Sequence, residues 1–410
     1  MPPGGLSADT PVGTQGTTLH AMERGIEANA QGLVDLRSEA VTQPVLASAL
    51  GDYLKGETAE RQFVRKADLA GPTIQARSEN AFIFGSMLTP ASGSGQFTYL
   101  ANYSLDAPFV GVRLILANVA TSVVTLPRMI AAPSASGSDI ANPVTAAGTA
   151  QPWATVTLNG SSTIRLPASP GGGLPSYTLS DIVPIQSVPR TDSGTGYLLY
   201  TRFVTDPASW NVSFFAARTG SGSADANLVA AINGGRTAQW GYIGGDHVTQ
   251  SLALTSASVS GNPGFAGGVV VGAVYYTTTR SYTLMAVGDS LTQGWQTASD
   301  YDGFARHAAS ALSAAGFATS YADASWTGQT TGQMQARAYA LLAAGLRPSV
   351  MTIPVDSPND YVRDTGAQSA LAGAQATGQQ RASALKLADY ARSLGVFPIL
   401  VTPLPLGLPG

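Results

Sequence analysis

Three short segments in the last third of the 410-residue chain contain residue types that could carry out acyl transfer. Ser290 follows an apolar run and a glycine in MAVGDSLTQGW, Gly328 lies in SWTGQTT, and Asn359 lies in VDSPND. A serine hydroxyl can attack a carbonyl carbon, and backbone N–H groups or a side-chain amide can hold the oxyanion that develops. With the backbone N–H of Ser290 included, the segments supply one hydroxyl and three donors, which predicts an esterase-type site.

Each of these residues also has an ordinary structural explanation. Asp289 and Ser290 are common turn and N-cap residues, Gly328 could be a turn glycine, and Asn359 with Asp360 could form an Asx turn. Taken alone, the GDS tripeptide favours helix capping. The order and spacing of all three segments favour the catalytic interpretation, because each segment follows a different predicted strand.

The region 281–410 has the alternation of elements that would position these residues. Strand-like runs SYTLMAV, FATSYADAS, SVMTIPV and FPILVTPL are separated by helical patterns such as FARHAASALSAAG, TTGQMQARAYALLAAG and ASALKLADYARSLG. This alternation predicts βαβ crossovers and a parallel sheet covered by helices on both faces. In such sheets ligands bind beyond the carboxyl ends of the strands, which is where Ser290 is expected.

On these residues the chain resembles the SGNH, or GDSL, hydrolase family. The first family block matches GDSLT at 288–292, the second-block glycine matches Gly328, and the third-block Asn-Asp matches Asn359-Asp360. The resemblance implies a flavodoxin-like α/β three-layer fold and an esterase, lipase or carbohydrate deacetylase activity that requires no metal or cofactor. It also implies that Ser290 is the nucleophile and that Ser290, Gly328 and Asn359 supply the oxyanion donors.

The chain departs from the family pattern in two places. Ser357, followed by Pro358, stands where the family usually has a glycine two positions before the asparagine. The Asp-x-x-His block that supplies the general base is also missing, because the three histidines are His20, His247 and His307, and none has that setting. The sequence therefore predicts either a truncated product or a degenerate hydrolase domain. The helical spacing of His307 favours a residue at the edge of the core.

The region 72–280 is rich in glycine, serine, threonine and β-branched residues, with short runs such as GVRLILANV and YLLYTRFV between turn-rich segments. Many short strands at this spacing predict an antiparallel β-sandwich or jelly roll. The pair Asp246-His247 indicates a hairpin turn more than a metal site, because no further ligands follow at suitable spacing. Three tryptophans are core candidates that could alternatively stack on sugars. They are Trp153, Trp210 and Trp240.

The region 1–71 is predicted to be a helical oligomerisation or attachment segment. Apolar residues recur at 3-4 spacing, with the polar Asn29 where the next apolar residue should fall, which is typical of a coiled coil with a fixed register. These apolar residues are Leu19, Met22, Ile26, Leu33 and Leu36. Residues 45–71 resemble the short coiled segments that carry domains on bacteriophage tail fibres, which implies a homotrimer and virion tail partners. The alternative is a single amphipathic helix lying on the next domain.

Composition narrows the classes of partner. The chain has 22 basic and 25 acidic residues without a long run of either sign, so nucleic acid and anionic membranes are not expected partners. It has no cysteine, which excludes disulfides and a cysteine nucleophile. The first residues lack the basic and apolar regions of a secretory signal, and no stretch approaches the ~18 apolar residues of a membrane span.

The sequence therefore predicts an SGNH-type serine hydrolase carried on a tail-fibre-like, virion or extracellular protein. Its expected substrate is a small ester or an acetylated carbohydrate. One alternative is a noncatalytic attachment protein that binds glycans through the β-rich region or a degenerate pocket. The other alternative is an ordinary bacterial esterase with an accessory β-domain.

Overall fold

A computed structural model describes most of the chain from Ser78 to Val401. The described residues are 78–83, 87–93, 95–139, 141–171, 174–206, 210–216, 239–248, 266–267, 269–294, 303–357, 359–360 and 370–401. The helical segment predicted at 1–71 lies outside them and stays a prediction. No helix in the described ranges has the length and apolarity needed to cross a membrane.

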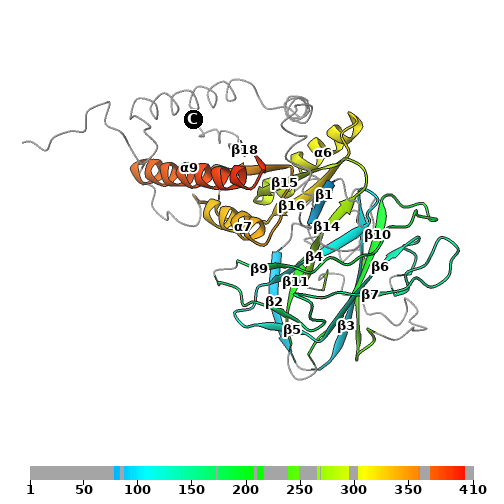
Figure 1. Cartoon of the computed structure of the whole chain (residues 1–410). Coiled ribbons are helices and arrows are strands. Elements are labelled where there is room, and N and C mark those ends of the chain that lie inside the picture. The colour runs from blue at the N-terminus through cyan, green and yellow to red at the C-terminus, as the bar shows by residue number, and fades with distance from the viewer. Residues whose placement is uncertain are drawn as a thin grey trace, which may run out of the picture.

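Five parallel strands form one end of an eight-stranded sheet (Figure 1). They are β15 (Tyr282–Gly288), β16 (Thr319–Ser325), β17 (Val350–Pro354), β18 (Phe397–Val401) and β1 (Ser78–Ile83). Their spatial order is β18-β17-β15-β16-β1, and all neighbouring pairs are parallel. From β15 the chain passes first to β16 on one side and later to β17 on the other. The switch point of the sheet therefore lies at the carboxyl end of β15, the position at which open α/β sheets bind ligands.

Helices connect the parallel strands, as the alternating pattern predicted. Helix α6 (Phe304–Ala314) packs its alanine- and leucine-rich face, with Leu312 fully buried, against one side of β15 and β16. Helices α7 (Thr331–Ala343) and α9 (Ala370–Ser393) pack against each other and share a second core with the other side of the sheet. The two helices meet partly through stacked rings of Tyr339 and Tyr390, whose centroids are 5.3 Å apart.

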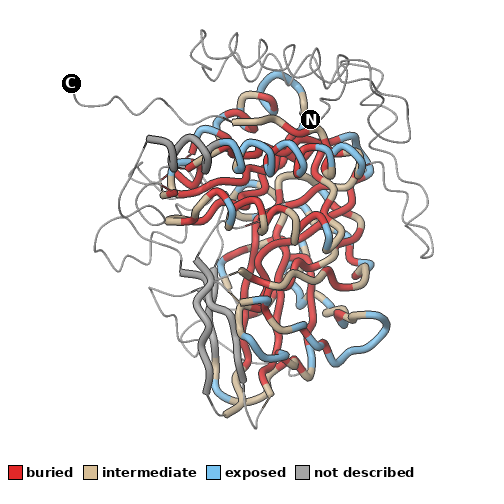
Figure 2. Tube along the Cα trace, turned by 90° about the vertical axis from the view of Figure 1, so that its left-hand side faces the viewer, coloured by how far each residue is buried: buried red, intermediate tan, exposed pale blue. Residues whose placement is uncertain are grey.

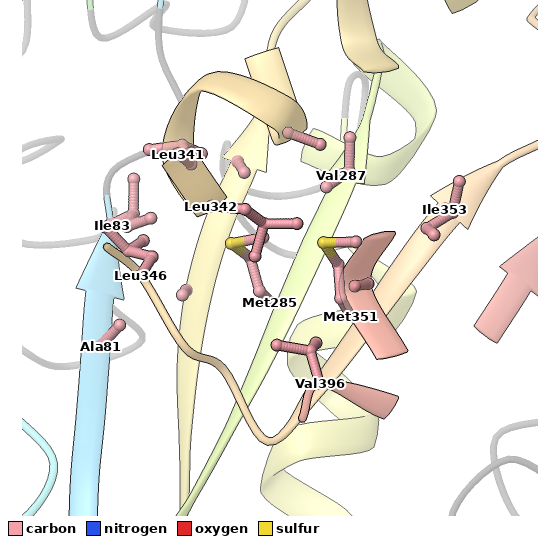
Figure 3. Close-up of a cluster of buried hydrophobic side chains, with 14 of the residues drawn as sticks. Ala81, Ile83, Met285, Val287, Leu341, Leu342, Leu346, Met351, Ile353 and Val396 are labelled. Carbon is pink, nitrogen blue, oxygen red and sulfur yellow. The ribbon is translucent and has the colours of Figure 1, made fainter. Parts of the chain in front are cut away.

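Strand β1 joins the parallel strands to an antiparallel part of the same sheet. It pairs with β16 on one side and with β14 (Val270–Thr277) on the other, and β4 (Gly111–Asn118) and β9 (Ser176–Leu179) follow. Ala81 and Ile83 of β1 belong to the same core cluster as Met285 and Met351 (Figure 3). The sheet therefore continues across residue 280, where the sequence predicted a boundary between a β-rich domain at 72–280 and an SGNH-like domain at 281–410.

A second, five-stranded antiparallel sheet faces the β14 and β4 end of the first sheet. Its strands, in spatial order, are β12 (Gln239–Gly244), β3 (Phe97–Leu105), β10 (Tyr197–Val204), β6 (Arg128–Ser134) and β7 (Ala154–Thr155). Smaller sheets contain β13 (Ala266–Gly267), β11 (Trp210–Ala216) and β2 (Met87–Gly93), and β5 (Val124–Leu126) with β8 (Ile164–Leu166). This arrangement agrees with the predicted antiparallel sandwich.

The side chains of strand β4 contribute to two hydrophobic cores, one on each face of the sheet. Successive side chains on a strand point to opposite faces. Val112, Leu114 and Leu116 accordingly lie in the core between the two sheets, whereas Ile115 and Ala117 lie in the core shared with α7. Buried residues run through both parts of the molecule (Figure 2). The fold is mostly β-sheet, compatible with a multidomain protein, and its sandwich and parallel parts share a sheet.

Candidate active site

Ser290 lies immediately beyond the carboxyl end of β15, as the sequence predicted. It is the first residue of the short helix α5 (Ser290–Gln293), and Asp289 caps that helix by accepting a 2.9 Å hydrogen bond from the Leu291 N–H. Ser290 is half-buried, whereas Asp289 is buried. A side chain at Gly288 would collide with Thr292, so glycine is needed for the chain to turn from the strand into α5.

Gly328 lies in the loop after β16 with a φ of +77°, a left-handed conformation that favours glycine. Thr327, the residue before Gly328, links this loop to α5 through hydrogen bonds. Gln293 Oε1 accepts hydrogen bonds from the Thr327 N–H at 3.1 Å and from the Thr327 hydroxyl at 2.5 Å. Because Gln293 is almost fully buried, this contact fixes the loop of Gly328 relative to the helix that begins at Ser290.

Asn359 lies in the loop after β17, and its side chain reaches back to the loop after β16. Asn359 Nδ2 donates a 3.0 Å hydrogen bond to the backbone carbonyl of Gln329, the residue next to Gly328. An asparagine amide has two N–H groups. One of them can therefore hold the loops together while the other addresses an oxyanion.

Asp360 supplies a second bond between the same two loops. Its carboxylate accepts hydrogen bonds from the Thr331 N–H at 2.9 Å, the Thr331 hydroxyl at 2.5 Å and the Ser357 N–H at 3.0 Å. Thr331 begins α7, whose first turn is closed by a capping box between Thr330 and Gln333. The Asn-Asp pair therefore acts mainly between loops and not as a local Asx turn.

A buried cation lies beneath the site. Arg337 of α7 donates hydrogen bonds to the carbonyl of Gly288, at 3.4 Å, and to the side chain of Gln329. Its guanidinium also lies 5.4 Å from the ring centroid of Trp326. Burial lowers the pKa of Arg337 to about 10, which still leaves the group charged at neutral pH. From the core, Arg337 therefore contacts the backbone at the end of β15 and a side chain of the loop after β16.

Partial similarity to known structures accompanies this geometry. No protein-family model matches the chain, and no curated protein sequence matches it. The crystal structure of TesA is 29% identical over 29% of this chain and 58% of TesA, with a TM-score of 0.23. AlinE4, an SGNH-hydrolase family esterase, is 20% identical over 32% of this chain and 66% of AlinE4, with a TM-score of 0.25.

A family two carbohydrate esterase from Cellvibrio japonicus is 9% identical over 78% of this chain and 91% of that protein, with a TM-score of 0.19. The chain spans less than two thirds of the length of TesA and of AlinE4. Part of the chain is thus similar to SGNH-family esterases, at low TM-scores and partial coverage.

Neither of the two described histidines belongs to one of the three site loops. His307 is exposed on α6, opposite the face formed by Ala305, Ala308 and Ala309, which corrects the expectation of an edge-of-core residue. The error arose because an alanine-rich helix offers more than one face with apolar spacing. His247 follows β12, and its Nε2 lies 2.7 Å from the Gly244 carbonyl. His20 lies outside the described residues.

The Asp246-His247 pair has local structural contacts. Asp246 forms an ion pair with Arg128 and accepts a 3.2 Å hydrogen bond from the Val248 N–H. Among the described residues, no group of three histidine or acidic side chains could hold a metal ion. Trp153 is half-buried, and one face of its ring is covered by the Arg202 guanidinium at 4.6 Å. The side chains of the other two tryptophans lie outside the described part.

Sequence reasoning missed three residues that support the site, namely Gln293, Arg337 and Ser357. Ser357 had a signal, because it replaces the glycine of the family pattern. Gln293 and Arg337 had none, since polar residues on helices usually face solvent. Their roles depend on contacts between segments that are far apart in the sequence.

Proposed function

We propose that the chain carries an SGNH-type esterase site on a flavodoxin-like sheet. With β15 counted first, the order β16-β15-β17-β18 is the 2-1-3-4 order of such sheets. The observation that carries the proposal is the set of hydrogen bonds that fastens the loops of Ser290, Gly328 and Asn359 to one another. A preorganised group of donors beside a serine hydroxyl is what acyl transfer requires.

In the proposed reaction the Ser290 hydroxyl oxygen attacks the ester carbonyl carbon while a base removes its proton. The Ser290 and Gly328 N–H groups and the Asn359 amide stabilise the resulting oxyanion. Collapse of the tetrahedral intermediate releases the protonated alcohol and leaves an acyl-serine, which water then hydrolyses to release the carboxylic acid and regenerate the Ser290 hydroxyl. In the family that the sequence resembles, the base is the histidine of an Asp-x-x-His loop.

The substrate is proposed to be a neutral ester. The charged side chains Asp289, Asp360 and Arg337 are all engaged in hydrogen bonds within the protein. They are therefore committed to holding the loops and are poorly placed to recognise an ionic substrate. In a virion or extracellular setting, acetyl groups on a cell-surface polysaccharide would provide such esters.

Labelling of Ser290 with a fluorophosphonate probe tests the esterase proposal directly. With imidazole added as an external base, the intact chain is expected to react covalently at Ser290, and Ser290→Ala is expected to abolish the reaction. Mass spectrometry of the labelled peptide identifies the site. Ser310→Ala, at an exposed serine of α6, is the matched control and should react like the unmodified chain. Equal labelling of Ser290→Ala would refute the proposal.

The positions of His247 and His307 favour a second candidate, a noncatalytic attachment protein whose pocket binds glycan esters without cleaving them. His307 is exposed on α6, and His247 follows strand β12 of the sandwich. An absence of Ser290 labelling even with imidazole, together with binding to an acetylated glycan array, would favour this candidate.

Oligomeric state tests the proposed fibre-like setting. We expect the intact chain to be a homotrimer in solution, with Leu19 to Leu36 in a parallel bundle and Asn29 facing its axis. A chain that starts at Pro72 should be a monomer with a little more than a quarter of that mass, because it lacks the apolar seam and 71 of the 410 residues. Multi-angle light scattering distinguishes the two states, and a monomeric intact chain would contradict the fibre setting.

A further inference from the structure

Ser357 is a completely buried residue between the end of β17 and Asn359, at 0% exposure. Its hydroxyl lies within hydrogen-bond distance of one group from each of the three site loops. It donates to Asp289 Oδ2 at 2.5 Å, lies 3.3 Å from the Gln329 carbonyl, and accepts from the Asn359 N–H at 3.2 Å.

The hydroxyl has one proton, so the three contacts differ in kind. The short distance to Asp289 is that of a hydrogen bond from a hydroxyl to a carboxylate, which is stronger than a bond between neutral groups. The Gln329 carbonyl, which lies farther from the hydroxyl, can interact only with the same proton. The oxygen lone pair remains available to accept the Asn359 N–H.

The bond to Asp289 acts on the residue directly before the nucleophile. One carboxylate oxygen of Asp289 accepts from the Leu291 N–H, and the other accepts from Ser357. With both oxygens held, the Asp289 side chain has one orientation, and the helix start at Ser290 is fixed with it. The same hydroxyl fixes the backbone of Asn359, whose amide is a proposed oxyanion donor.

We infer that Ser357 is a positioning residue that aligns Ser290 with the Asn359 amide through its hydroxyl. The inference rests on the proposed function for its catalytic consequence, but its structural part stands on the three contacts alone. Ser357 occupies the place of the family glycine, which has no hydroxyl. In this chain a side-chain hydroxyl therefore links the loop of Ser290 to the loop of Asn359, a link that a glycine could not make because it has no side chain.

Hydrogen–deuterium exchange tests the structural part on the intact chain. Ser357→Ala should speed exchange in the peptides that contain Leu291 and Asn359 about tenfold, because a hydrogen bond to a charged group is lost. The matched control is Ser349→Ala, which removes a buried hydroxyl at the opposite end of β17 that accepts from the Thr283 N–H at 3.0 Å. That control should leave both peptides unchanged. Unchanged exchange in Ser357→Ala would overturn the inference.

Labelling kinetics test the catalytic part. With imidazole present, Ser357→Ala should lower the maximal rate of Ser290 phosphonylation about tenfold and leave the probe's half-saturation concentration unchanged, because the hydroxyl positions the nucleophile without touching the probe. Ser349→Ala should change neither quantity. An unchanged rate in Ser357→Ala, despite faster exchange, would reduce Ser357 to a structural residue and overturn the inference.

A second variant covers the case in which Ser357→Ala does not fold, and the exchange data cover the case in which Ser290 does not react. If Ser357→Ala does not fold, Ser357→Gly removes the same hydroxyl and gives the residue of the family pattern, and both measurements are repeated with it. If Ser290 of the unmodified chain does not react at all, the proposed function fails, while the exchange data still decide whether Ser357 positions the two loops.

Discussion

The 410-residue chain is expected to hydrolyse esters on the order of 10⁶-fold more slowly than a version that supplies a histidine base. A serine hydroxyl is a weak nucleophile until a base takes its proton, and loss of the histidine from a serine triad has about this effect. The oxyanion donors should still give a rate enhancement of roughly 10³- to 10⁴-fold over the uncatalysed reaction in water. An aryl acetate is the substrate of choice, because its phenolate leaving group can depart without protonation by a general acid.

The measurement compares the 410-residue chain with Ser290→Ala, with His307→Ala and with a chain extended by a segment that contains an Asp-x-x-His loop. Extension should restore turnover that depends on Ser290. His307→Ala should change nothing, because that side chain is exposed on the face of α6 opposite the sheet. Fast turnover by the 410-residue chain, abolished by His307→Ala, would show instead that His307 acts as the base.

The elements that position the site could be predicted from the sequence because their signals are local. The runs that precede the three site segments are short and are each followed by a helical pattern, and each forms a strand of the parallel sheet. The residues that follow them are small or polar, as strand ends require. Ser290, Gly328 and Asn359 could therefore be placed at one sheet edge without coordinates.

The contacts that hold the site together could not be predicted, because they join segments far apart in the chain. In the sequence Ser357 is only a departure from a family pattern, whereas in the structure its hydroxyl bonds to Asp289, 68 residues earlier. The same limit applies to β1, whose six residues SENAFI carry no signal of their partners. Their pairing with β16 and β14 depends on sterics and burial that appear only when the sheet assembles.

The position of β1 also leads to an expectation about folding. A fragment comprising 281–410 is expected not to fold, although its sequence resembles a domain. Deleting the preceding residues removes strand β1 and leaves one edge of β16 without its neighbour. It also removes Ser78 and Asn80, which form buried hydrogen bonds with Ser281 and Thr283.

The buried core makes the expected loss of folding free energy in the 281–410 fragment large. Eight buried residues before 281 belong to the cluster that α7 and α9 cover, and they are Ala81, Ile83, Ile115, Ala117, Leu179, Val271, Val274 and Tyr276. At about 1 to 3 kcal/mol for each large apolar side chain, their removal costs on the order of 10 kcal/mol, comparable with the whole stability of a typical domain. Circular dichroism should therefore show no cooperative thermal transition for 281–410, whereas a chain that starts at Pro72 should show one. A cooperative transition in the shorter fragment would mean that the parallel strands fold without β1, and that the shared sheet is a contact between two independent domains.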